Sequence, residues 1–146
     1  MKTAGLAVKM GYTNVVVYNE GLPEWIKRGY PANLKQVYPK IEIPVVPAAD
    51  LKAMIDRKEN IFILDIRDED DLKGGTIAGS RNIDLEVLDA SLSKVPKGKK
   101  IVIVDLHGKQ TMMAGRFLAS KGYDNLVRLD GGFASGWLKE GLPIAK

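Results

Sequence analysis

The chain of 146 residues contains one pattern of residues twice, about 111 positions apart. The pattern begins with Gly-Tyr, continues through a short apolar run to a glycine, and ends with Trp, Lys, Gly and Pro. It covers residues 11–31 and again 122–143, where one extra residue separates the glycine from the tryptophan. A repeat at this interval is a whole domain, too long for a solenoid unit. The sequence therefore predicts the tail of one domain (1–33), a linker (34–46) and one complete domain (47–146).

The composition and charge of the chain exclude several functional classes. With 45% hydrophobic and 27% charged residues it has the composition of an ordinary globular protein. No uninterrupted apolar run approaches the length of a membrane span. Cysteine is absent, which excludes disulfides, thiolate metal sites and a cysteine nucleophile. The net charge of +4 comes from residues 1–40, because residues 41–146 carry equal numbers of basic and acidic side chains. We therefore expect neither a nucleic acid nor a membrane as partner.

The leading segment, residues 1–33, is expected to contain a helix, a strand and a second helix. Helical patterns cover 3–10 and 22–28, and a short β-branched run covers 14–18. Four prolines follow, from Pro31 to Pro47, without a periodic pattern, as is typical of a linker. Because this α-β-α segment has apolar faces that would cover a sheet, we expect it to contact the complete domain or a second chain. The second case would give a homodimer through the leading segment.

The rest of the chain is predicted to alternate strands with helices. Continuous apolar runs at 61–64 and 101–104 are typical of strands buried on both faces, and each is followed by an aspartate. This alternation predicts an α/β fold with a parallel β-sheet flanked by helices on both faces. Ligands of such sheets bind at the carboxyl ends of the strands, so the segment 105–110 is the candidate site. Further strands are expected at 81–83 and 126–129, and helices at 48–57, 86–92, 111–121 and 133–139.

Several spaced motifs within residues 43–146 resemble those of the rhodanese-like family. The resemblance implies a rhodanese-like fold for the complete domain, and it implies that residues 1–33 are the C-terminal third of a second, truncated copy. Thr76 departs from the family pattern, which usually has histidine at this place. The matching motifs are Leu64-Asp65-Ile66-Arg67, the run from Asp71 to Ile83, the turn from Val95 to Lys100, and the final Gly-Gly, Trp and Gly-x-Pro.

Asp105 stands at the position of the catalytic cysteine of active family members. In those members the strand ends in a cysteine that takes up a sulfane sulfur as a persulfide and passes it to an acceptor. Sulfur transfer requires a thiolate, because an S–S bond must form and then break, and a carboxylate cannot carry sulfur in this way. The resemblance therefore makes Asp105 the catalytic position and implies that this position is inactive.

The loop after Asp105 is expected to form a cradle for an anion. Successive backbone N–H groups that lead into a helix N-terminus create a concave positive site. We expect the Asp105 carboxylate to occupy this site itself and to accept N–H groups of its own loop. The family uses the counterparts of Asp65 and Arg67 to brace the loop, so these two residues are expected to be structural. The cradle residues are Leu106, His107, Gly108, Lys109, Gln110 and Thr111.

These observations favour a catalytically silent rhodanese-like module of a tandem protein that acts in interaction or regulation. The expected partner is a protein or another rhodanese-like domain, and neither a cofactor nor a metal is expected. The acidic run 68–71 is expected to begin a helix rather than to bind a metal. The expected location is the cytoplasm, or the periplasm if the natural N-terminus lies further upstream.

Two enzyme alternatives remain open. The first is a sulfurtransferase acting on thiosulfate or a persulfide, with its cysteine in another domain or replaced in this chain. The second, more remote alternative is a phosphatase based on Asp105. The apolar strand followed by Asp-Leu-His-Gly resembles the first motif of haloacid-dehalogenase-type phosphatases, in which the aspartate is nucleophile and metal ligand. His107 takes the place of the second aspartate of that motif.

Overall fold

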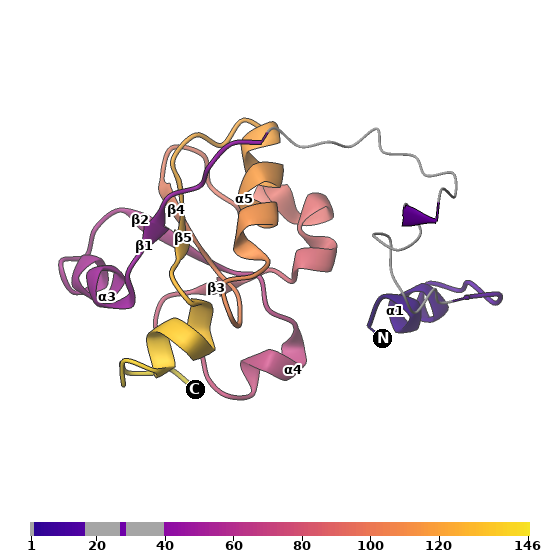
Figure 1. Cartoon of the computed structure of the whole chain (residues 1–146), viewed down its shortest axis with the longest axis horizontal. Coiled ribbons are helices and arrows are strands. Elements are labelled where there is room, and N and C mark those ends of the chain that lie inside the picture. The colour runs from indigo at the N-terminus through magenta and orange to yellow at the C-terminus, as the bar shows by residue number, and fades with distance from the viewer. Residues whose placement is uncertain (1, 17–26, 29–39) are drawn as a thin grey trace. The chain divides into compact units, whose positions relative to one another are not determined.

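The computed structural model of the chain contains two units, residues 1–37 and 38–146 (Figure 1). It describes residues 2–16, 27–28 and 40–146. Within these ranges, no helix combines the length and the apolar character that a membrane crossing requires. Every β-strand of the described ranges lies in the larger unit.

The smaller unit contains helix α1 (Lys2–Lys9), which corresponds to the helix predicted at 3–10. The strand predicted at 14–18 is not formed at residues 14–16, and its last two residues lie outside the described ranges. An isolated short strand is unstable without a neighbouring strand, and in the described ranges residues 14–16 pair with none. The helix predicted at 22–28 also lies outside these ranges, except for its last two residues, of which Lys27 is helical.

The larger unit is built on a five-stranded parallel sheet with the strand order β1-β5-β4-β2-β3 (Figure 1). The strands β2 and β4 pair along their full length, beginning with Ile61 opposite Lys100. Because all strands run in the same direction, their carboxyl ends meet at one end of the sheet, where Asp65, Asp105 and Asp130 lie. The strands are β1 (Val45–Val46), β2 (Ile61–Asp65), β3 (Arg81–Asn82), β4 (Lys100–Val104) and β5 (Leu126–Leu129).

Side chains of the central strands alternate between two hydrophobic cores, one on each face of the sheet. In β4, Ile101 and Ile103 belong to one core, and Val102 and Val104 belong to the other. Helices cover both faces, so the predicted α/β fold is confirmed. The first core is closed by α5 (Thr111–Ser120), η1 (Leu85–Val87) and η2 (Asp89–Lys94), and the second by α3 (Ala48–Asp56) and η3 (Gly132–Leu138).

The segment predicted as one helix at 86–92 forms two 3-10 helices, η1 and η2. Leu85 and Leu88 lie three residues apart, which matches the turn of a 3-10 helix, with about three residues per turn. Asp84 caps η1, because its side chain accepts the N–H of Glu86 at 2.9 Å. The segment is therefore helical as predicted, but it is divided into two 3-10 helices on either side of the buried Leu88.

The helix predicted at 133–139 is present as η3, which is a π-helix. It begins at the second of two adjacent glycines with positive φ, +66° at Gly131 and +63° at Gly132. The indole N–H of the buried Trp137 donates to the carbonyl of Pro143 at 2.9 Å. A π-turn, bonded from i to i+5, holds one residue more than an α-turn.

Two short elements complete the larger unit. The acidic run 68–71 begins helix α4 (Glu69–Leu72) as predicted, with the Asp68 side chain accepting the N–H of Asp71 at 3.0 Å. Strand β1 lies within the segment 34–46, for which the sequence predicts a linker and no strand. It pairs with β5, with Val45 opposite Arg128, and so the end of that segment is part of the sheet.

Candidate functional site

Asp105 follows β4 directly, and its carboxylate turns back into the loop 105–110. The residue is only 2% exposed. Oδ1 accepts the N–H of Gly108 at 2.5 Å, and Oδ2 accepts the N–H of Gln110 at 2.7 Å. Helix α5 begins at Thr111, so the carboxylate also lies before the positive end of a helix dipole. The prediction that Asp105 accepts N–H groups of its own loop is confirmed.

A pair of glycines after β5 packs against this loop. A Cβ atom on Gly132 would lie 2.6 Å from Asp105 Oδ1 and 2.7 Å from the backbone nitrogen of Gly108. Beyond the pair, the N–H of Phe133 donates to the carbonyl of Asp105 at 2.7 Å, and the next N–H donates to the carbonyl of Leu106 at 2.8 Å. Glycine is required at position 132, both for this contact and for its positive φ.

Asp65 and Arg67 form a buried ion pair at the carboxyl end of β2. Arg67 Nε and Nη2 donate to the two Asp65 carboxylate oxygens at 2.9 Å and 2.7 Å, and both side chains are at most 1% exposed. The guanidinium also donates to the carbonyl of Gly75 at 3.0 Å and lies 4.0 Å from the ring centroid of Phe133. Since Phe133 also donates to the Asp105 carbonyl, the ion pair contacts the loop through one aromatic residue.

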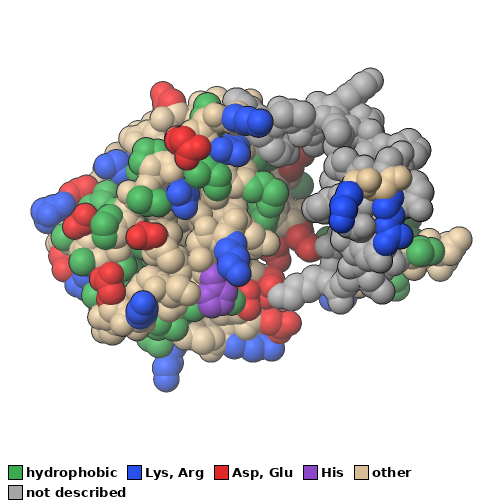
Figure 2. Space-filling model, in the orientation of Figure 1, with side chains coloured by type: hydrophobic (Ala, Val, Ile, Leu, Met, Phe, Trp, Pro, Cys, Tyr) green, Lys and Arg blue, Asp and Glu red, His purple; other side chains and the backbone are tan. Residues whose placement is uncertain are grey.

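The other side chains of the loop lie in different surroundings. His107, the only histidine of the chain, is exposed (Figure 2), and its Nδ1 lies 2.8 Å from the hydroxyl of Ser135. Thr111 is fully buried and donates its hydroxyl to the carbonyl of Gly108 at 3.3 Å. Lys109 is exposed and forms no ion pair in the part of the chain that the structure describes. The structure therefore brings Thr111 to the cradle and leaves the two basic side chains at its rim.

This geometry limits the chemistry of Asp105. Both carboxylate oxygens accept backbone N–H groups, and the residue is almost completely buried. A carboxylate nucleophile needs access to a phosphoryl group, and the burial of Asp105 does not offer it in this arrangement. Among residues 2–16, 27–28 and 40–146, no three His, Asp or Glu side chains cluster as metal ligands would.

Three residues of the site were not singled out in the sequence. Phe133 and Gly132 belong to the Gly-Gly segment, which was recognised as a motif of the repeat and of the family resemblance but not as part of the site. The two adjacent glycines after a strand were a usable signal, because such pairs occur where two backbones approach closely. Ser135 had no signal in the sequence, because its contact with His107 comes from a segment far along the chain.

The comparisons with known proteins agree with this fold. Residues 47–140 match the family of rhodanese-like domains. Thiosulfate sulfurtransferase GlpE of Shewanella oneidensis is 33% identical over 77 residues, which are 53% of this chain and 76% of that protein. A sulfurtransferase of Allochromatium vinosum is 28% identical over 86 residues, which are 59% of this chain and 79% of that protein.

Solved structures give the same result. The crystal structure of a rhodanese-related protein from Thermoplasma volcanium is 32% identical and superimposes with a TM-score of 0.63. The match covers 70% of this chain and 97% of that protein. With its parallel sheet, its loop after β4 and this family match over most of its length, the chain belongs to the rhodanese-like family.

Proposed function

We propose that the chain is a catalytically silent rhodanese-like module that acts in interaction or regulation within a tandem protein. The observation that carries this proposal is the carboxylate of Asp105, which accepts the N–H groups of Gly108 and Gln110 at the centre of the loop. A persulfide anion in the same loop would need the same donors. The carboxylate therefore takes the place of the loaded sulfur and leaves no atom that can carry sulfur.

We propose a protein, or another rhodanese-like domain, as the partner of this module. The smaller unit supports this, because Val8, Met10, Tyr12 and Val16 are between 59% and 86% exposed. Exposed apolar side chains gathered in one segment are typical of interaction surfaces. The segment 1–33 would then contact a second copy of the chain and give a homodimer. Light scattering that finds a monomer at every protein concentration would contradict the homodimer.

A second candidate function is favoured by the relatives. Proteins similar to this chain are named as sulfurtransferases, one of them as a thiosulfate sulfurtransferase. In that case the chain would belong to an enzyme whose thiolate comes from another domain, since this chain has no cysteine. The module would then position or regulate the reactive domain instead of carrying sulfur itself.

Sulfur transfer by the chain and by its Asp105→Cys variant tests the proposal. We expect the wild-type chain to release no thiocyanate from thiosulfate and cyanide above the buffer rate. In the variant, the new thiolate should attack the sulfane sulfur of thiosulfate, so that one S–S bond forms, another breaks and sulfite leaves. Mass spectrometry should then detect one added sulfur atom.

The matched control for this experiment is Ser93→Cys, which places a cysteine at an exposed position of η2. We expect this variant to form no stable persulfide, because it lacks the N–H donors of the loop. Thiocyanate release by the wild-type chain would contradict the silent module. A folded Asp105→Cys variant that takes up no more sulfur than Ser93→Cys would show that the loop is not a sulfur cradle.

A further inference from the structure

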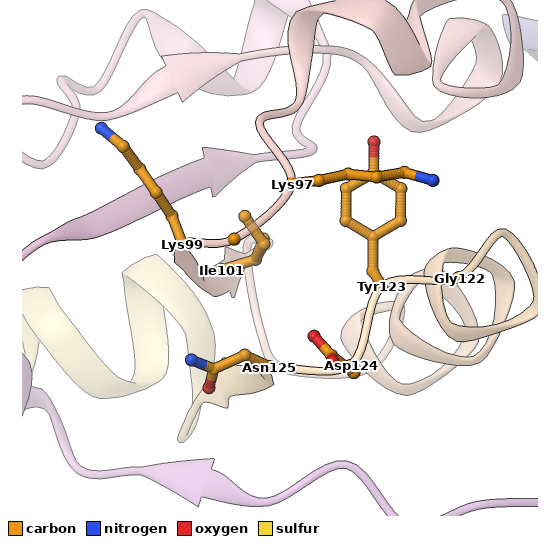
Figure 3. Close-up of a pocket in the computed structure, with 8 residues that line it drawn as sticks. Lys97, Lys99, Ile101, Gly122, Tyr123, Asp124 and Asn125 are labelled. Atoms are coloured by element: carbon orange, nitrogen blue, oxygen red, sulfur yellow. The ribbon is translucent and has the colours of Figure 1, made fainter.

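A hollow of about 210 Å³ lies at the amino end of the sheet, at the opposite end of the strands from Asp105. It is lined by the turn before β4, with Lys97 and Lys99, and by the segment before β5, with Tyr123 and Asp124. Figure 3 shows the two lysines extending from one turn in different directions, with the Tyr123 ring beside Lys97. The wall of this hollow therefore carries two cations and one carboxylate.

A second hollow, of about 360 Å³, lies beside strand β3. Arg81 and Lys94 line it together with the apolar side chains of Phe62 and Ile83. No acidic residue is among the described residues that line this hollow. Its wall therefore carries two cations without a compensating carboxylate.

The two hollows are neighbours on one face of the sheet. Phe62, in the second hollow, pairs with Ile101, in the first, across β2 and β4. Both side chains pack in the same hydrophobic core. The segment 94–99 lines both hollows, with Lys94 in the second and Lys97 and Lys99 in the first. Arg81 also lines the second hollow. We call Arg81, Lys94, Lys97 and Lys99 the basic surface.

The backbone of the basic surface is held by contacts with Tyr123 and its neighbours. The Tyr123 hydroxyl hydrogen-bonds to the carbonyls of Leu92 and Val95 at 3.1 Å and 2.9 Å. Lys97 Nζ lies 5.4 Å from the Tyr123 ring centroid and 3.4 Å from the carbonyl of Lys121. These contacts fix the backbone of the lysine-bearing segment before any ligand binds. Binding then costs less ordering of the chain.

The charges of the basic surface are available to a ligand. Within the part of the chain that the structure describes, Arg81, Lys94, Lys97 and Lys99 form no ion pair. The linings of the two hollows carry four basic residues and one acidic residue, Asp124, so their net charge is +3. This excess is local, because residues 41–146 as a whole are neutral.

We propose that the basic surface binds an acidic segment of a partner protein. Two adjacent hollows with cations around each suit an extended chain with several carboxylates, whereas one small anion would use only one of them. A nucleic acid or a membrane would extend beyond these four basic residues onto the rest of the domain, which is neutral overall and would attract it only weakly. The proposal goes beyond the silent loop, because no residue of the loop 105–110 lines either hollow and the surface does not require Asp105.

Fluorescence anisotropy with a labelled oligoglutamate peptide at low ionic strength tests this surface. We expect the double variant Lys94→Gln, Lys99→Gln to bind the peptide about 2- to 30-fold more weakly, as expected for the loss of two exposed ion pairs. The matched control removes two lysines elsewhere, Lys139→Gln with Lys146→Gln, and should bind almost as the wild type does. Addition of salt to about 0.5 M should weaken binding by the wild type.

Three results would overturn the proposal. The first is no binding of the oligoglutamate peptide to the wild type, and the second is an equal loss of binding in the control variant. The third is tighter binding of oligothymidylate, or of phosphatidylserine vesicles, that is lost in the Lys94, Lys99 variant. Failure of this binding proposal can be distinguished from failure of the silent-module proposal, because the sulfur-transfer assay with Asp105→Cys reports only on the loop 105–110.

Discussion

Replacing Asp105 by asparagine should destabilise the larger unit, although the two side chains have the same shape. The carboxylate accepts two backbone N–H groups, from Gly108 and Gln110. Asparagine keeps one acceptor oxygen and turns an NH₂ group toward the second N–H, which then has no acceptor. A hydrogen bond to a charged group contributes about 1.5–3 kcal/mol. Relief of the buried charge offsets part of this, so we expect a net loss of about 1–3 kcal/mol in the free energy of unfolding.

Urea unfolding followed by circular dichroism measures this loss. The matched control is Asp130→Asn, which makes the same change of charge at an exposed position directly after β5. We expect the control to stay within about 0.5 kcal/mol of the wild type. The midpoint of the Asp105 variant should fall while the denaturant slope stays unchanged. Equal stability of the two variants would refute the reasoning, because the backbone bonds would then not outweigh the desolvation of the carboxylate.

The same loop offers a second measurement with Asp105→Ala. Removal of the carboxylate leaves the N–H groups of Gly108 and Gln110 facing an empty anion site. Thiosulfate should therefore raise the melting temperature of this variant, with about 2.7 kcal/mol of stabilisation at a concentration 100-fold above Kd. The wild type should not respond, because its own carboxylate occupies the site. An equal response of both proteins would show that the anion binds elsewhere.

Two further substitutions test the surroundings of the loop by urea unfolding. Gly132→Ala should lose about 2–4 kcal/mol, because its Cβ would lie 2.6 Å from Asp105 Oδ1 and its φ is +63°. Gly79→Ala, with φ of +81° and open space, should lose only about 1–2 kcal/mol, and equal losses would contradict the packing argument. Arg67→Lys should lower the free energy of unfolding by about 2–4 kcal/mol, because lysine cannot form the buried bidentate pair with Asp65. Arg57→Lys, in an exposed pair, should change stability by less than about 1 kcal/mol, and a similar loss there would refute the role of burial.

The central strands could be predicted because their signal is contained in a few adjacent residues. The runs at 61–64 and 101–104 are apolar at every position, as is typical of strands covered on both faces. The structure places alternate residues of each run in opposite cores. The bonds of Asp105 to its own loop were also predictable, because they depend on one residue type and a short loop before a helix.

Features that depend on distant segments could not be predicted. Strand β1 has only two residues, and it exists because β5 pairs with it. The π-helix η3 depends on the fit of Gly132 against the loop after β4, a contact with a segment far away in the sequence. The 3-10 helices η1 and η2 lie on either side of Leu88, which packs in the core under the sheet's helical cover. In each case the local pattern allowed an α-helix or a loop, and tertiary packing decided between the alternatives.

The loop after β4 does not need a cysteine to keep its shape. Its backbone is held by α5, by the bond from Phe133 to the Asp105 carbonyl and by the contact with Gly132. What the loop requires at its centre is negative charge, since its N–H groups and the helix dipole favour an anion. The Asp105 carboxylate meets this requirement, because it accepts two N–H groups of the loop. Sulfur chemistry and loop geometry are therefore separable in this fold, and membership of the rhodanese-like family does not by itself give this chain an activity.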